Sequence, residues 1–369
     1  MSVIDSALRQ IKQLHPYLPG KPVEELEREL GVRNACKLAS NENPLGCSPL
    51  AQTAMDRVVA QVEFYPDANA YYLKQRMSQK LGVGENQITI GNGSNDVLDL
   101  IARCFLDSQR AAVFSEYAFM VYGMVTQACG ARAQMAPALP FDSAQPYGHD
   151  LDAMLRQVDD STHIIFIANP NNPTGTWLER DALEAFIEQV PSHIAIVIDE
   201  AYFEYVELED YPDTSQWLSR FPNLIVTRTF SKIYGLAGLR IGYALCSPEL
   251  CDLLNRVRQP FNGNSLALAA ALSAFDDDEF VRQSCQSNLE GLQRMQDWFS
   301  DKEIPFIPSA GNFLTVRLGE SSPEIYQGLL EQGIIVRPVA NYGMPDFLRI
   351  SVGTENQIEQ LFEVLETLL

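Results

Sequence analysis

The chain has 369 residues, of which 46% are hydrophobic and 20% are charged, and its formal net charge is −21. This apolar content is enough to build a folded core in one large domain or two smaller ones, which excludes a disordered or collagen-like chain. So acidic a protein repels nucleic-acid backbones, and any anionic ligand must be held by locally placed Arg or Lys side chains.

The first forty residues contain a helix and two proline-rich breaks. They lack the basic segment followed by an apolar segment that marks a secretory leader. The longest mostly apolar stretch of the chain, 266–275, is too short to span a bilayer. We therefore expect a soluble, cytoplasmic protein without a membrane partner, whose first forty residues pack on a unit formed by the end of the chain.

Short β-branched runs alternate with helix-like segments in the middle of the chain. Strands are expected at 88–90, 111–114, 131–135, 163–168, 194–198, 224–227 and 241–245. Several of these runs are continuously apolar, which is typical of strands covered on both faces. The alternation with helices predicts an α/β fold whose large domain holds a mostly parallel seven-stranded sheet between helices.

A helix-rich stretch after 260–264 leads out of this sheet. Strand-like segments at 313–316, 334–336 and 347–352, followed by an amphipathic helix from Glu355, predict a smaller α+β unit. We expect a large domain at 40–265 and a small domain formed by 1–39 together with 266–369.

The cysteines and histidines show no pattern of a disulfide framework or a metal site. The seven cysteines are spread out without a C-x-x-C pair, which favours a reducing compartment. The four histidines show no H-x-x-x-H or H-E-x-x-H spacing, so no metal is expected.

Polar segments follow two of the expected strands, and ligands of open α/β sheets bind at the carboxyl ends of strands. The segment 91–96, Gly-Asn-Gly-Ser-Asn-Asp, fits an ordinary turn or a phosphate cradle at a helix start equally well. It lacks the third glycine of G-x-G-x-x-G, so it does not predict a dinucleotide site. The segment 169–175, Asn-Pro-Asn-Asn-Pro-Thr-Gly, carries more amides than a turn requires, which favours a functional role.

Charged residues follow the next two strands. Asp199 ends an apolar run, where a buried carboxylate needs a cation or several donors; a structural ion pair is the alternative reading. Two hydroxyls, Lys232 and Arg240 then form a local positive cluster. Lys232 could be an ion-pair partner, a phosphate ligand or a nucleophile, and the cluster alone does not separate these roles.

Together these segments resemble the fold-type-I pyridoxal-phosphate aminotransferases, in order and in spacing. The matching motifs are Asn172-Pro173-Thr174-Gly175, Asp199-x-x-Tyr202, Thr229-x-Ser231-Lys232 and Arg240. Within that family the chain is similar to the histidinol-phosphate aminotransferases at 16–22, 37–46, 65–67, 337–338, 342–343 and 348–354. It departs at Ser115-Glu116-Tyr117, where the family usually has a proline before the tyrosine.

The resemblance implies pyridoxal 5′-phosphate as cofactor and a role for each matching residue. Lys232 would bind the cofactor covalently and move a proton, and Asp199 would pair with the ring nitrogen. Tyr202 and Asn172 would hydrogen-bond the phenolic oxygen, and Tyr117 would stack on the ring. The cofactor phosphate would be held by Gly93, Ser94, Asn95, Thr229, Ser231, Arg240 and, from the neighbouring subunit, Tyr65. The substrate would be bound by Tyr17, Asn172, Arg337 and Arg349.

The resemblance also implies a homodimer with shared active sites and small-molecule substrates. These would be histidinol phosphate and 2-oxoglutarate, giving imidazole acetol phosphate and glutamate in histidine biosynthesis. The alternatives are an aromatic amino acid aminotransferase, a pyridoxal-phosphate decarboxylase of a phosphorylated amino acid, and a binding protein without activity. The intact set of Lys232, Asp199 and Arg240 disfavours the last. A surface salt bridge is the alternative role for Arg337, and a turn role is the alternative to substrate contact for Asn312.

Overall fold

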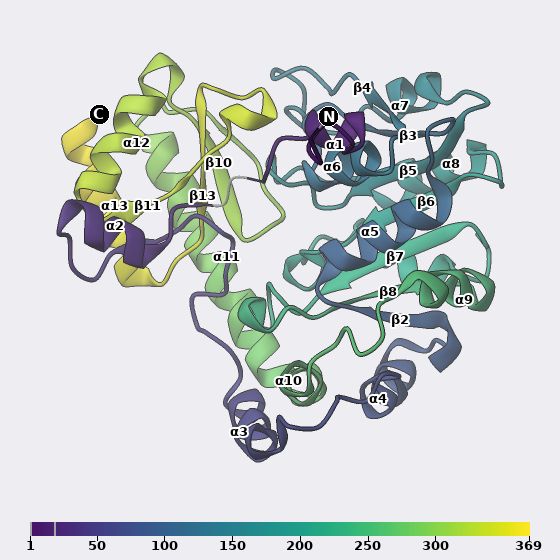
Figure 1. Ribbon diagram of the computed structural model, residues 1–369. Helices are drawn as coiled ribbons and strands as arrows, with labels where there is room; N and C mark the ends of the chain where they lie inside the picture. The colour runs from purple at the N-terminus through teal and green to yellow at the C-terminus, as the bar shows by residue number, and fades with distance from the viewer. Residues whose placement is uncertain (1, 18–19) are drawn as a thin grey trace.

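The computed structural model describes residues 2–17 and 20–369, so Pro19 of the N-terminal motif lies outside the described residues. The chain forms a larger part around a seven-stranded sheet and a smaller part around a four-stranded sheet (Figure 1). This confirms the expected α/β class. The division of the chain at 39/40 and 265/266 stays a prediction.

All seven strands expected in the larger part are present. The sheet has the order β2-β8-β7-β6-β5-β3-β4, and only β8 runs antiparallel to its neighbours. The strands are β2 (Ile88–Gly91), β3 (Ala111–Ser115), β4 (Arg132–Ala136), β5 (Thr162–Ala168), β6 (Ala195–Asp199), β7 (Leu224–Thr229) and β8 (Gly242–Cys246). The carboxyl ends of β5, β6 and β7 therefore lie at one edge, which is where the polar segments were expected to meet.

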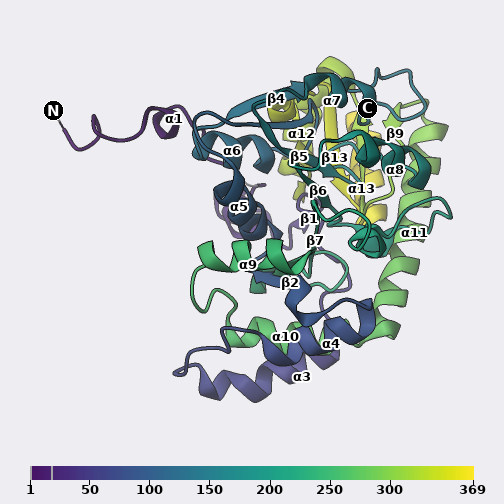
Figure 2. The same cartoon turned by 90° about the vertical axis from the view of Figure 1, so that its right-hand side faces the viewer.

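Helices cover both faces of this sheet, because its central strands are apolar on both sides. Along β5, Ile164 and Phe166 enter one core while Ile165 and Ile167 enter the other. The first core is shared with α5 (Ser94–Phe105), α6 (Val121–Ala128) and α9 (Pro248–Val257). The second is shared with α3 (Pro49–Val58), α4 (Tyr71–Leu81), α7 (Leu151–Gln157), α8 (Arg180–Gln189) and α10 (Ser265–Phe275). Figure 2 shows α3, α4 and α10 side by side at the base of this part.

The smaller part has the strand order β12-β13-β10-β9, with a separate parallel pair, β1 and β11. Its strands are β1 (Cys36–Lys37), β9 (Phe306–Ile307), β10 (Phe313–Arg317), β11 (Ile334–Ile335), β12 (Arg337–Pro338) and β13 (Phe347–Ser351). The helices α2 (Val23–Leu30), α11 (Asp278–Asp301), α12 (Ser322–Glu331) and α13 (Glu355–Leu368) belong to it. The helix expected from Glu355 is confirmed.

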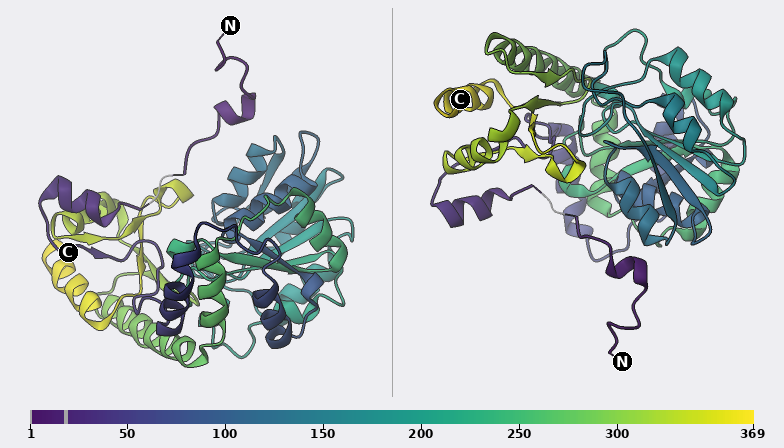
Figure 3. Two further views of the ribbon diagram at one scale, coloured as in Figure 1. Left: turned by 60° about the horizontal axis from the view of Figure 1, so that its bottom comes forward. Right: turned by 90° about the horizontal axis from the view of Figure 1, so that it is seen from above.

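The N-terminal segment does not pack as one piece. Leu26 of α2 packs with Leu330 and Ile335 of the smaller part, as expected. The short helix α1 (Arg9–Lys12) instead lies against α6, where the Gln127 side chain donates to the Gln10 carbonyl at 3.1 Å. Helix α1 has no buried residue, so it has no apolar face that would pack into the C-terminal core. The chain before α1 projects from the body of the protein (Figure 3). Among the described residues, no helix combines the length and apolarity needed to cross a membrane.

A buried ion cluster ties the ends of β6 and β7 together. Arg228 on β7 is only 2% exposed, and its Nη2 lies 2.7 Å from Glu200 and 2.6 Å from Asp213. Its guanidinium also lies over the Phe203 ring, 3.5 Å from the centroid. Glu200 is fully buried and receives further hydrogen bonds from Thr214. The residue after Asp199 is thus fixed by a buried guanidinium.

Replacing Arg228 with Met is expected to destabilise the protein, because it leaves the Glu200 carboxylate buried without its cation. We expect the free energy of unfolding to fall by about 3–5 kcal/mol, measured by urea denaturation. The matched control is Arg220→Met, which removes half-exposed ion pairs with Glu184 and Glu188 and should change stability by less than about 1 kcal/mol. Equal effects of the two substitutions would contradict the importance of the buried cluster.

Candidate active site

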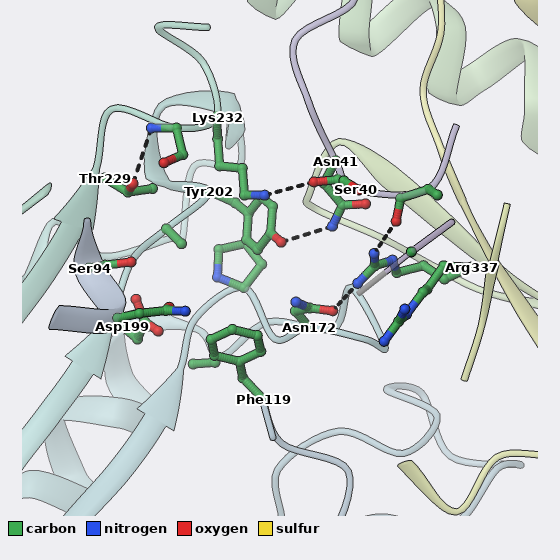
Figure 4. A pocket seen from close by; sticks show the side chains of 18 of the residues that line it. Ser40, Asn41, Ser94, Phe119, Asn172, Asp199, Tyr202, Thr229, Lys232 and Arg337 are labelled. Atoms are coloured by element: carbon green, nitrogen blue, oxygen red, sulfur yellow. Dashed lines mark hydrogen bonds between the residues drawn. The ribbon is translucent and has the colours of Figure 1, made fainter. Parts of the chain in front are cut away.

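A cavity of about 190 Å³ lies at the carboxyl edge of the large sheet, facing the smaller part (Figure 4). The structure brings most of the predicted site residues to its wall: Tyr17, Ser94, Asn95, Asn172, Asp199, Tyr202, Thr229, Ser231, Lys232, Arg240, Arg337 and Arg349. The strand topology gathers them, because the segments after β2, β5, β6 and β7 emerge at the same edge.

Three predicted residues are not on this wall. Gly93 lies directly behind it, and a Cβ there would fall 2.4 Å from the Arg240 guanidinium, so only glycine permits that approach. Tyr117 packs on Tyr147, with ring centroids 4.5 Å apart, and Phe119 supplies an aromatic wall instead. Tyr65 is 82% exposed and stacks on Phe261, away from the cavity.

One end of the cavity is suited to an anion. Helix α5 begins at Ser94, directly after Gly93, whose φ of +88° is a conformation that glycine readily adopts. The free N–H groups at the start of α5 carry the positive end of the helix dipole. Arg240 donates to the Ser231 hydroxyl at 3.2 Å, and Thr229 lies beside them. Hydroxyls, amides and one guanidinium converge here, which is the donor set that binds a phosphate group.

Asp199 presents a buried carboxylate at the end of β6. It is 4% exposed, and burial raises its pKa to about 6. The Thr227 hydroxyl donates to Oδ1 and the Tyr122 hydroxyl donates to Oδ2, each at 2.9 Å, and both favour the ionised form. The carboxylate is therefore ready to pair with a cationic group in the cavity.

Lys232 presents its amine to the same cavity. Its Nζ donates to the Ser40 carbonyl at 3.0 Å. Burial, followed by the nearby Arg349 guanidinium, lowers the pKa of Lys232 to about 7. A substantial fraction of this amine is thus uncharged at neutral pH, as a nucleophile or a general base requires.

Tyr202 is held by residues that sequence reasoning did not assign to the site. Its hydroxyl accepts a hydrogen bond from Asn41 Nδ2 at 2.9 Å, and Asn41 adopts a left-handed φ of +55°. Ser351 of β13 fixes that conformation, because its hydroxyl accepts from the Asn41 amide and donates to the Asn41 side chain. The segment 37–46 had matched the family, but its link to Tyr202 depends on tertiary packing.

Two arginines lie together on the smaller part's side of the cavity. Arg337 of β12 pairs in register with Arg349 of β13, and the Arg337 guanidinium lies 5.7 Å from the Tyr17 ring. Arg349 donates to the Asn172 side chain and to the Ala39 carbonyl, while its buried Nε has no hydrogen-bond partner in the described structure. Burial lowers the pKa of Arg349 and the neighbouring Arg337 adds to this, so a bound anion would relieve the pair.

Comparisons with known proteins agree on one family. Residues 33–365 match the family described as "Aminotransferase class I and II". The chain is 50% identical over 369 residues to histidinol-phosphate aminotransferase 2 of Methylococcus capsulatus, with 100% of both chains covered. It is 51% identical over 361 residues to histidinol-phosphate aminotransferase 2 of Pseudomonas aeruginosa, covering 97% of this chain and 96% of the relative. A crystal structure of histidinol-phosphate aminotransferase from Sinorhizobium meliloti in complex with pyridoxal-5′-phosphate has a TM-score of 0.88 at 28% identity, with 98% of each chain covered.

The lowered pKa of Lys232 predicts an unusual pH dependence of its reactivity. Protein stripped of bound small molecules is treated with formaldehyde and cyanoborohydride, and methylation at Lys232 is followed by peptide mass spectrometry. The initial rate should rise through pH 7, because the amine loses its proton there. Nα-acetyl-lysine in the same tube, with a pKa of about 10.4, should gain reactivity only at much higher pH. Parallel pH profiles would contradict the perturbed environment of Lys232.

Proposed function

Since the chain belongs to the aminotransferase class I and II family, we propose that it transfers an amino group between histidinol phosphate and 2-oxoglutarate, with pyridoxal phosphate as cofactor. The products would be imidazole acetol phosphate and glutamate, a step of histidine biosynthesis. The observation that carries this proposal is a pocket with two cationic ends, Arg240 beside Ser231 at one and the Arg337–Arg349 pair at the other, whose wall also holds Lys232 and Asp199.

The residues present fit the cofactor. The phosphate would lie between the start of α5 and Arg240, where Gly93 leaves room that a Cβ would fill. The ring nitrogen would face Asp199, and Asn172 and Tyr202 would reach the phenolic oxygen. Phe119 lines the same space and is the aromatic side chain that we assign to the ring face.

The chemistry divides between the cofactor and the chain. Pyridoxal phosphate supplies an aldehyde that reacts with amines and a ring that accepts electrons. Asp199 would hold a proton on the ring nitrogen, which would strengthen that electron acceptance. With the cofactor bound, Lys232 would hold its aldehyde carbon, and once displaced by the substrate amine, its uncharged amine would move the proton between the substrate Cα and the cofactor C4′.

Substrate selection falls to the second cationic end. Figure 4 shows Arg337 on the opposite side of the pocket from Ser94 and Thr229. A phosphomonoester arm would bind there to Arg337, Arg349 and Tyr17, since guanidinium groups match phosphate and carboxylate geometry. Glutamate would present its carboxylates to the same arginines. Phe119, Tyr17 and Tyr202 line the pocket, and these rings would also suit a phenyl side chain, which keeps an aromatic aminotransferase as the second candidate.

A homodimer with shared sites is part of the proposal. Val62, Phe64, Tyr65 and Phe261 line one hollow and are each 43% exposed or more, and a monomer rarely leaves such a patch uncovered. A second copy covering this patch would bring Tyr65 to the phosphate end of the neighbouring site. The proposed location is the cytoplasm, which the seven free cysteines support.

Substitution of Arg337 should separate the two candidate substrates. Holoenzyme is mixed with histidinol phosphate, phenylalanine, tyrosine or glutamate, and the cofactor absorbance reports each half-reaction. Arg337→Ala should weaken the reaction with histidinol phosphate by about 100-fold in kcat/KM, because a charged hydrogen bond to phosphate is lost, and weaken phenylalanine far less. Lys232→Ala should give no turnover. Equal losses for histidinol phosphate and phenylalanine would contradict the assigned phosphate site.

The shared site predicts complementation between two defective subunits. Lys232→Ala alone should be inactive, and Tyr65→Ala alone should be weak at limiting cofactor. When the two variants are mixed and allowed to exchange, about a quarter of the sites combine both intact residues, so activity should exceed the sum of the separate variants. Absence of complementation, in a mixture that sedimentation shows to be dimeric, would contradict the contribution of Tyr65 across the interface.

A further inference from the structure

Tyr122 lies beneath the cavity and is fully buried. It belongs to the first turn of α6, and its ring stacks on Phe166 of β5, with centroids 4.8 Å apart and planes 1° from parallel. Phe119 meets the same ring edge-on at 5.9 Å. These contacts fix the ring, so the position of its hydroxyl is set by the core and not by solvent.

The Tyr122 hydroxyl forms a hydrogen bond with the carboxylate of Asp199. It donates to Oδ2 at 2.9 Å, while the Thr227 hydroxyl of β7 donates to Oδ1 at the same distance. A carboxylate oxygen can accept more than one hydrogen bond. One hydroxyl on each oxygen therefore leaves both free to accept another from a donor in the cavity. Two rigid elements thus hold the carboxylate from opposite oxygens.

We propose that Tyr122 is a positioning residue that keeps Asp199 ionised and aimed at the ring nitrogen of the cofactor. This inference rests on the proposed function. Tyr122 itself does not line the cavity, and it acts through the carboxylate. Its hydroxyl opposes the burial that would otherwise protonate Asp199.

The other groups that face Asp199 do not replace this hydrogen bond. Lys232 favours the ionised carboxylate through its charge, but burial leaves that amine partly uncharged near neutral pH. Tyr202 lies nearby, but it brings no positive charge to the Asp199 carboxylate. Thr227 supplies the remaining donor. Loss of the Tyr122 hydroxyl therefore removes one of two direct donors and should raise the pKa of Asp199 further above about 6.

The test compares Tyr122→Phe with wild type in the affinity of the apoenzyme for pyridoxal phosphate, titrated by absorbance between pH 5.5 and 8.5. At high pH, Asp199 is ionised both in the apoenzyme and with cofactor bound. The hydrogen bond missing from the variant is then missing from both states, so the dissociation constants of variant and wild type should agree. At low pH, the apoenzyme carboxyl is protonated and must ionise on binding, so the variant should bind about tenfold more weakly at pH 5.5. The fall in affinity should begin about one pH unit higher in the variant.

Two further variants separate positioning from a general loss of structure. Thr227→Val removes the donor on the other oxygen and should show the same pH-dependent ratio. Tyr243→Phe alters a tyrosine that is buried as deeply on β8 but does not contact Asp199, and its ratio should stay near one at every pH. Thermal unfolding of each apoenzyme shows whether the variant is folded.

The outcomes are distinct. If Tyr122→Phe weakens pyridoxal phosphate binding by the same factor at every pH, the inference is overturned, because that result indicates structural loosening alone. Unchanged affinity at every pH would also overturn it. If that variant does not fold, 3-fluorotyrosine at position 122, a stronger donor, should shift the pH profile in the opposite direction, and an unchanged profile would overturn the inference. If wild-type protein does not bind pyridoxal phosphate, the proposed function itself fails.

Discussion

The burial of the Asp199 carboxylate is the constraint on which the rest of the site depends. A carboxylate that is removed from water needs donors or a cation, and the fold provides Thr227 from β7 and Tyr122 from α6. The neighbouring Glu200 is fixed by Arg228, so the end of β6 is held on both sides. The remaining capacity of Asp199 faces a cavity that fits a protonated ring nitrogen.

The cations of the site gain their chemistry from being crowded together. The chain carries a net charge of −21, yet Lys232, Arg240, Arg337 and Arg349 line one pocket. Burial, and after it their mutual repulsion, lower the pKa values of Lys232 and Arg349. Anionic groups at either end of the pocket would relieve this repulsion, while burial, the larger cause, still keeps the pKa of Lys232 low. Phosphate recognition and amine reactivity would thus depend on the same pocket.

The seven strands of the larger sheet could be predicted, because β-branched runs alternate with helix-like segments and several of the runs are continuously apolar. The two-residue strands β1, β9 and β12 are too short to show a period, and pairing alone defines them, whereas β11, of the same length, lies in the apolar run expected at 334–336. Most site residues were predictable because they follow strands. Tyr122 and Asn41 were not, since the first looks like a core aromatic and the second contacts Tyr202 only because Ser351 of the smaller part holds it in place. The exchange of Tyr117 for Phe119 at the cavity depends on turn geometry, and the role proposed for Tyr65 requires a second copy of the chain.

The protonation state of the cofactor ring tests the central claim most directly. Apoenzyme is loaded with pyridoxal phosphate labelled with ¹⁵N in the ring, and the nitrogen chemical shift is followed by NMR across pH 6–8.5. The account predicts a protonated ring nitrogen throughout this range in wild type, and loss of that proton in Asp199→Ala. An unprotonated nitrogen in wild type, or the same shift in both proteins, would contradict the role of the buried carboxylate.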